Sequence, residues 1–304
     1  MNREAEKSPT YLIDAGDALF NTTYRDARTE ERRKNVAQAI IEAYNAMDCK
    51  VMNVGVNDLT YGMEFLEEIA AKTTFPLISA NTLDKQTGEK LFPASHILKT
   101  PDLKIGFVGV TNGDARLEAF QFGDPLTAAQ EAVADIRDKV DLVILLANVD
   151  DRYETTLAEE VEGVDFLVRS RTARYSRQPL LNGKTVVLRT GNRGKYAGIL
   201  HVRRPDPVGD FKDLSKQMQR VEFAQRRLDM LAKDVPEGQS LEAYYAKDET
   251  RLGLVKNLRA EEQRNRELLE TLGNGYFFTA IALDKNIADD PNILPIVEEY
   301  ITKH

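Results

Sequence analysis

The sequence predicts a mixed α/β fold with a mostly parallel sheet system, to which a pair of long helices is attached. Short apolar runs alternate with helical patterns throughout residues 11–204. The composition changes at 204–209, where two prolines and a glycine interrupt the pattern, and two long, highly charged helical patterns follow. Alternation of strands and helices is typical of right-handed crossovers in parallel sheets. A chain of 304 residues is long enough for one large domain with an appendage.

The candidate strands are short, and several are continuous apolar runs. Such runs are expected where both faces of a strand are covered. A strand at 276–283 follows the helical pair, so we expect the chain to return there to the main body. The strands expected before the break cover 11–14, 50–54, 76–79, 104–110, 141–146, 165–168, 185–188 and 197–202.

Amphipathic helices are expected between these strands. The first begins after Thr29, a favourable N-cap residue, and its apolar residues recur every three or four positions. Three further helices are predicted over 64–71, 126–140 and 156–161. The apolar residues of the first helix are Val36, Ile40, Tyr44 and Met47.

The two charged patterns after the break predict an antiparallel helical hairpin over 210–272. The first helix covers about 210–233, and the second runs from Ser240 to Gly273. Each would be roughly 35–45 Å long at 1.5 Å per residue. The expected domains are therefore an α/β body at 1–204, the hairpin at 205–272, and a returning strand with a polar tail at 273–304.

Composition excludes several classes of protein. The net charge is −8, with 41 basic and 49 acidic residues, and no long basic run occurs, which argues against a nucleic-acid partner. Apolar runs reach only about eight residues, too short to span a membrane. No signal peptide is visible in the polar start of the chain. The single cysteine, Cys49, excludes an internal disulfide and a cysteine-based metal site.

The chain is also poor in histidine. His96, His201 and His304 are its only imidazoles, and they lie far apart in the sequence. Catalytic zinc sites usually use two or three histidines. A dinuclear metal centre built on imidazole is therefore hard to assemble here.

Seven segments between residues 12 and 198 carry motifs in a fixed order. Residues 12–17 read LIDAGD and residues 54–62 read VGVNDLTYG. In order and spacing, the set resembles the metallophosphoesterase domain of bacterial 5′-nucleotidases, in the calcineurin-like phosphoesterase superfamily. The other segments are PLISAN (76–81), KIGFVGV (104–110), DLVILLAN (141–148), VDFLVRSRTA (164–173) and TGNRGKYAG (190–198).

This resemblance implies a layered α/β/β/α sandwich of the metallophosphoesterase type, with a two-metal site. In the family an aspartate bridges two metal ions that polarise the phosphate, and a metal-bound water or hydroxide attacks in line. By position, Asp17 is that bridging carboxylate. The family's D-x-H strand has no counterpart before Tyr11, so we expect the first strand of the fold to be missing from 1–204.

The remaining catalytic positions depart from the family pattern. Val56 stands at a metal-binding asparagine, and Asn57 stands at the catalytic histidine. Valine has no donor atom, and an amide cannot act as a general acid near neutral pH. Asn148 replaces another metal-binding histidine, and Arg171 and Ala173 replace the last two. We therefore expect no intact catalytic set and no bound metal.

The leading hypothesis is a catalytically inactive domain that acts as a scaffold or protein-interaction module. The hairpin at 210–272 and the degenerate cleft would be its binding surfaces. A looser resemblance, to proteins in which such a domain adjoins a multihaem c-type cytochrome module, suggests a cytochrome partner. The chain itself has no C-x-x-C-H haem motif. The resemblance also implies a periplasmic or cell-surface location.

Two other functions remain open. One is an active metal-dependent phosphoesterase, resembling a 5′-nucleotidase, that uses Asp17 with non-standard oxygen ligands and a divalent metal such as Mn, Zn, Mg or Ca. The other is a non-catalytic anion-binding domain that uses Arg169, Arg171 and Arg174.

Arg171 suggests what takes the place of the metals. One hypothesis is that Arg171, helped by Arg169, neutralises Asp17 or Asp14; the alternative is a solvated surface arginine. Similarly, five polar residues near strand ends would either form an oxygen-only calcium or magnesium site or line a polar loop rim. These five are Asn57, Asp58, Asn148, Asp150 and Asp151.

Overall fold

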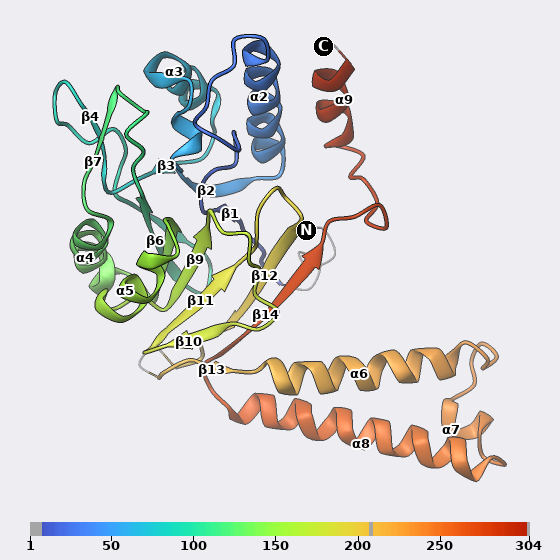
Figure 1. Ribbon diagram of the computed structural model, residues 1–304. Coiled ribbons are helices and arrows are strands. Elements are labelled where there is room, and N and C mark those ends of the chain that lie inside the picture. Colours follow the sequence, from blue (N-terminus) through green and yellow to red (C-terminus); the bar gives the residue numbers. More distant parts are fainter. Residues whose placement is uncertain (1–7, 207–208, 303–304) are drawn as a thin grey trace. The chain divides into compact units, whose positions relative to one another are not determined.

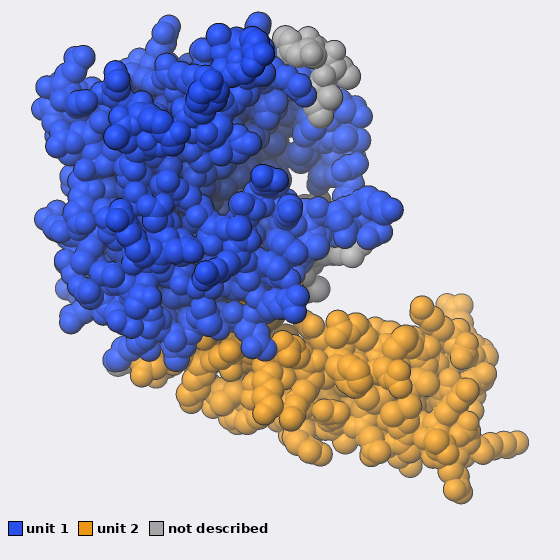
Figure 2. All heavy atoms as spheres, viewed as in Figure 1, with its two compact units in different colours: residues 1–198, 280–304 blue, residues 199–279 orange. Residues whose placement is uncertain are grey.

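The computed structural model describes residues 8–206 and 209–302. The first seven residues, part of the predicted break, and His304 lie outside the described residues. The chain divides into two compact units, coloured separately in Figure 2. Unit 1 comprises residues 1–198 and 280–304, and unit 2 comprises residues 199–279.

Unit 1 contains a three-stranded parallel sheet covered by two helices. Its strands lie in the order β1 (Leu12–Asp14), β2 (Cys49–Asn53) and β3 (Leu77–Ile78). Helices α2 (Glu30–Ala46) and α3 (Gly62–Lys72) pack on it through a buried cluster that includes Cys49. The predicted face of α2 is partly wrong, because the helix turns Ala37 and Ile41 inward and leaves Val36 43% exposed.

A second sheet of unit 1 has six strands in the order β10-β11-β9-β8-β6-β5. The four strands from β11 to β6 run parallel, and antiparallel strands close both edges. Their bounds are β5 (Ser95–Lys99), β6 (Lys104–Thr111), β8 (Leu142–Asn148), β9 (Phe166–Ser170), β10 (Leu180–Asn182) and β11 (Thr185–Arg189). A short antiparallel pair, β4 (Thr82–Asp84) and β7 (Phe120–Phe122), accompanies them.

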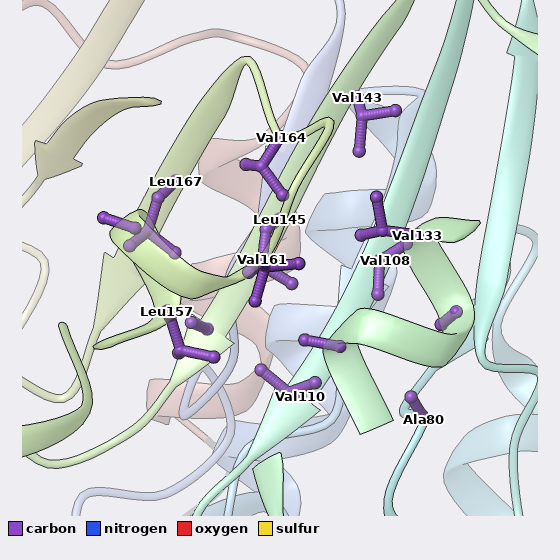
Figure 3. Packing of buried hydrophobic residues seen from close by; sticks show 14 of the residues in the cluster. Ala80, Val108, Val110, Val133, Val143, Leu145, Leu157, Val161, Val164 and Leu167 are labelled. Atoms are coloured by element: carbon purple, nitrogen blue, oxygen red, sulfur yellow. The ribbon is translucent and has the colours of Figure 1, made fainter. Parts of the chain in front are cut away.

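Two helices cover the outer face of the six-stranded sheet. Helix α4 (Pro125–Ile136) has Pro125 in its first turn, and the side chain of Asp124 accepts a hydrogen bond from the backbone N–H of Thr127. Helix α5 (Arg152–Glu160) lies beside it. Both contribute to the aliphatic cluster of Figure 3, where valines and leucines of β6, β8 and β9 meet those of α4 and α5.

The inner faces of the two sheets are joined by the buried side chain of Asn53. Its Nδ2 donates to the carbonyl of Ala15 at 3.0 Å and to that of Val110, in β6, at 3.1 Å. Unit 1 is therefore a layered α/β/β/α sandwich, as the sequence predicted (Figure 1). Helix α9 (Leu294–Thr302) lies beside α2, where the hydroxyl of Tyr300 donates to Glu42.

Unit 2 consists of a small sheet and the helical hairpin. The sheet has the order β12-β14-β13, and the first three residues of β12 and the last three of β14 are assigned to unit 1. Helices α6 and α8 run antiparallel and bury a seam that includes Leu228 and Leu258 (Figure 1). The bounds are β12 (Tyr196–Arg203), β13 (Lys212–Asp213), α6 (Ser215–Ala232), α7 (Leu241–Tyr244), α8 (Glu249–Thr271) and β14 (Gly275–Ala282).

The hairpin corrects one sequence expectation. A single second helix was predicted from Ser240 onward, whereas the structure contains two helices. Ser240 caps only the short α7, and Asp248 caps α8 by accepting a hydrogen bond from the backbone N–H of Arg251. Within the described residues, no helix is both long and apolar enough to cross a membrane.

Candidate functional site

Polar residues from β1, β2, β8 and β9 meet where these strands end. The turn after β1 holds Asp17, and the turn after β2 holds Asn57, whose backbone N–H and Nδ2 donate to Asp17 at 2.7 and 2.9 Å. Asn148, at the end of β8, accepts from the backbone of Val56 at 3.0 Å and donates to Ser170 of β9 at 2.8 Å. The sequence-predicted positions Asp17, Val56, Asn57 and Asn148 therefore share one site.

The turns after β1 and β2 approach each other so closely that glycine is required. Gly16 has φ of +101°, and a Cβ placed on it would lie 2.8 Å from the backbone nitrogen of Gly55. A Cβ on Gly55 would in turn lie 2.3 Å from the nitrogen of Asp17. Asp17 itself has φ of +65°, a left-handed conformation that disfavours most side chains. The backbone thus fixes the position of the Asp17 carboxylate.

Asp58 organises this site by binding the backbone of both turns, a role that the sequence did not reveal. Its carboxylate accepts hydrogen bonds from the backbone N–H groups of Asp17, Leu19 and Gly55 at 2.8–2.9 Å. Burial raises the pKa of Asp58 well above its ordinary value, and the neighbouring charge of Asp17 raises it further. Asp58 therefore holds the two turns together.

The other two carboxylates of the site are also held by donors of the protein. Burial raises the pKa of Asp17, although hydrogen bonds from Asn148 and Asn57 and the charge of Arg171 oppose that rise. Asp14 accepts hydrogen bonds from the backbone of Gly16 at 2.7 Å and from the hydroxyl of Tyr44 at 2.8 Å. Burial raises the pKa of Asp14 as well.

The hypothesis that Arg171 neutralises Asp17 or Asp14 is only partly consistent with the geometry. Its guanidinium lies 3.5 Å from Asp150 and donates weakly to the carbonyl of Asn112. It acts on Asp17 through its charge and without an ion pair within hydrogen-bonding distance. Arg171 adopts φ of +57°, the second left-handed residue of the site.

Arg169 does not help Arg171, contrary to the hypothesis. Its side chain is 1% exposed and pairs with Glu154 at 2.6 Å and Asp151 at 2.9 Å. Glu154 also pairs with Arg189. Residues two positions apart in a strand lie on the same face of the sheet. Strand β9 ends at Ser170, however, so Arg171 leaves the strand and lies in different surroundings from Arg169.

The remaining predicted residues lie outside the carboxylate cluster. Arg174 is largely exposed, with the carboxylate of Asp151 at 3.9 Å, and Ala173 lies in the same exposed loop. His96 lies in the edge strand β5, and His201 stacks on Phe277 in unit 2 at 3.9 Å between ring centroids.

The carboxylate oxygens that a divalent metal would need are engaged by donors of the protein itself. Across residues 8–206 and 209–302, no group of three or more His, Cys, Asp or Glu side chains is arranged to hold a metal ion. The proposed oxygen-only site is not assembled, because Asp150 and Asp151 pair with arginines and Asp58 binds backbone N–H groups. The site thus offers polar contacts in place of metal ligands.

No protein-family profile matches the chain, but individual proteins do. A 2′,3′-cyclic-nucleotide 2′-phosphodiesterase/3′-nucleotidase of Yersinia enterocolitica is 30% identical over 108 residues, covering 32% of this chain and 17% of the relative. A 5′-nucleotidase of Vibrio cholerae is 25% identical over 155 residues, covering 48% of this chain and 27% of the relative. The chain thus spans about a quarter or less of these relatives.

Solved structures show the same fold. The calcineurin-like phosphoesterase YfkN of Bacillus subtilis superposes with a TM-score of 0.61 over 99% of this chain and 86% of that chain, at 14% identity. The matches show a relationship, at low sequence identity, to the 5′-nucleotidases and the calcineurin-like phosphoesterase superfamily. The solved structures show that the layered sandwich is shared with members of that superfamily.

Proposed function

We propose that the chain is a 5′-nucleotidase-like domain that has lost two-metal hydrolysis and acts as a scaffold or binding module. The observation that carries this proposal is the use of the carboxylate oxygens. Asp17 and Asp58 together accept five hydrogen bonds from the N–H groups of neighbouring turns. Oxygens engaged in this way are poorly placed to coordinate a dication.

The residues around these carboxylates support the same conclusion. Hydrolysis by two metals needs ions that lower the pKa of a bound water. Val56 supplies no donor atom, and Arg171 brings a fixed positive charge close to Asp17. Asn57 and Asn148 form hydrogen bonds within the protein, and neither amide can exchange a proton with a leaving group.

The competing proposal is an active metal-dependent phosphoester hydrolase with non-standard ligands. The relatives favour it more directly than they favour an inactive domain, because their names describe nucleotidases and phosphodiesterases. The protein would then recruit Mn, Zn, Mg or Ca through Asp17 and surrounding oxygens.

Metal content and turnover together distinguish the two proposals. Purified protein is measured by elemental analysis and assayed on a generic phosphate monoester with and without Mn²⁺. We expect substoichiometric metal and no turnover above background, both in the unaltered protein and in Asp17→Ala. Stoichiometric divalent metal, with turnover abolished in Asp17→Ala, would establish the hydrolase instead. The exposed variant Arg226→Gln, on α6, controls for unspecific effects of substitution.

The partner and the location are parts of the same proposal. We propose that the hairpin formed by α6 and α8 contacts another protein, and that the chain acts in the periplasm or at the cell surface. The exposed side chains of Phe223 and Met230 on α6 support such a contact. Truncation of the hairpin, followed by measurement of binding to a candidate multihaem cytochrome, tests the partner that the family resemblance suggests.

A further inference from the structure

In one segment of this acidic chain, every charged residue is basic. Between Asp165 and Asp206 the sequence contains no acidic residue, although the whole chain carries a net charge of −8. Arg169 and Arg189 are paired with Glu154 inside unit 1, but most of the other cations of this part of unit 1 are exposed. The ten basic residues are Arg169, Arg171, Arg174, Arg177, Lys184, Arg189, Arg193, Lys195, Arg203 and Arg204.

Two loops of unit 1 bring several of these cations to one place. The loops, 171–177 and 190–195, are joined by a backbone bridge between Tyr175 and Thr190. The backbone N–H of Ser176 also donates to the carbonyl of Arg189 at 2.8 Å. The second loop turns through three left-handed residues, Gly191, Arg193 and Gly194, so that the Arg193 and Lys195 positions are exposed.

A pair of stacked aromatic rings connects these two loops. Tyr175 and Tyr196 stack with centroids 4.1 Å apart and an interplanar angle of 15°, and both are partly exposed. The Nε of Arg177 donates to the hydroxyl of Tyr175 at 3.0 Å. We call the surface formed by Arg174, Tyr175, Arg177, Arg193, Lys195 and Tyr196 the tyrosine–arginine patch.

The charges of this patch have few partners in the protein. Among the described residues, Arg177, Arg193 and Lys195 form no ion pair, and Arg174 has a carboxylate only at 3.9 Å. Guanidinium and ammonium groups bind phosphate oxygens through charge-assisted hydrogen bonds. Aromatic side chains bind nucleobases by stacking. The patch therefore combines the two contacts that a nucleotide requires.

We infer that the tyrosine–arginine patch binds a nucleotide, with the base against the tyrosine pair and the phosphates on the surrounding cations. A long nucleic acid fits less well, because the rest of the chain is acidic and the patch provides one aromatic pair only. No metal takes part in this binding. The inference therefore does not depend on whether the carboxylate site hydrolyses anything.

Calorimetric titration of the full chain with ATP, in EDTA and at low ionic strength, tests the inference. We expect saturable binding that weakens as salt is added. Arg177→Gln and Tyr196→Leu should each lower the affinity at least about tenfold. Arg226→Gln, an exposed substitution on α6, and Asp17→Ala, at the carboxylate site, should leave the affinity for ATP unchanged. Circular dichroism verifies that each variant is folded.

Three comparison ligands distinguish the chemistry. Adenosine and inorganic phosphate should each bind more weakly than ATP, because each makes only one of the two contacts. Absence of saturable ATP binding overturns the inference, and so does equal binding of ATP and inorganic phosphate. Tighter binding of a single-stranded oligonucleotide than of ATP would assign the patch to nucleic acid. Loss of ATP binding in Asp17→Ala would move the ligand to the carboxylate site.

Discussion

Unit 1 buries two clusters of charged groups and satisfies them in different ways. The carboxylates of Asp14, Asp17 and Asp58 are held mainly by amide N–H groups and have raised pKa values. Glu154 is instead clamped between the guanidinium groups of Arg169 and Arg189. The first cluster joins neighbouring turns through hydrogen bonds to N–H groups, whereas the second is an internal ion-pair network. A buried carboxylate at a family position is therefore no indication of a metal by itself.

The largest loss of stability is expected when the ion-pair network around Glu154 is broken. Glu154→Ala leaves the buried guanidinium of Arg169 with only the exposed Asp151 carboxylate. Removal of one partner of a buried pair typically costs about 3–5 kcal/mol. Urea unfolding monitored by circular dichroism measures the loss. Asp151→Ala is the control and should cost less than about 1 kcal/mol, since its side chain is 59% exposed. Equal losses in the two variants would contradict the assignment of Glu154 as the central partner.

A smaller loss of stability is expected when the cluster of Asp14, Asp17 and Asp58 is altered. Asp58→Asn retains one acceptor oxygen, so at least one of the N–H groups of Asp17, Leu19 and Gly55 loses its partner. An unsatisfied buried donor costs about 1–3 kcal/mol. Asp84→Asn, where the carboxylate accepts two backbone N–H groups in an exposed turn, should cost less. If Asp58→Asn left the free energy of unfolding unchanged in the same assay, Asp58 would not be the residue that holds the two turns together.

The stability lost when each cluster is disrupted should also change with pH, and in opposite directions for the two clusters. The pKa of Asp58 is raised in the folded protein, so the stability lost in Asp58→Asn should shrink as pH rises above about 4. For Glu154, burial alone would raise the pKa, but hydrogen bonds from Arg189 and Arg169 hold it below its ordinary value. The stability lost in Glu154→Gln should therefore grow as pH rises toward about 4.3 and stay constant above it. Unfolding titrations from acid to neutral pH measure both slopes, and slopes of equal sign would be inconsistent with this contrast.

The smallest difference in stability is expected from the left-handed backbone conformation of Arg171. Both Arg171→Gly and Arg171→Ala remove the guanidinium, but only glycine adopts φ of +57° without strain. The glycine variant should therefore be more stable than the alanine variant by about 1 kcal/mol. Thermal unfolding of the two proteins gives this difference directly. Identical midpoints would mean that the turn relaxes when the side chain is removed.

The sequence allowed the prediction of most of the framework but less of the site. That Asp17 and Asn148 lie close to the same strand ends was predictable, because the motifs are contiguous and their order fixes which strand ends meet. The contrasting surroundings of Arg169 and Arg171 were not, since they depend on the residue at which β9 ends. The role of Asp58 was missed as well, because its hydrogen bonds reach backbone groups 39 and 41 positions away.

Cys49 at the start of β2 has a practical consequence. It is the only cysteine of the chain, it is 4% exposed, and burial raises the pKa of its thiol to about 12. The thiolate that attacks maleimide dyes is therefore scarce near neutral pH. A substitution such as Arg226→Cys would take up a single fluorophore on the hairpin without any change to the native sulfur, so that partner capture becomes visible by fluorescence anisotropy.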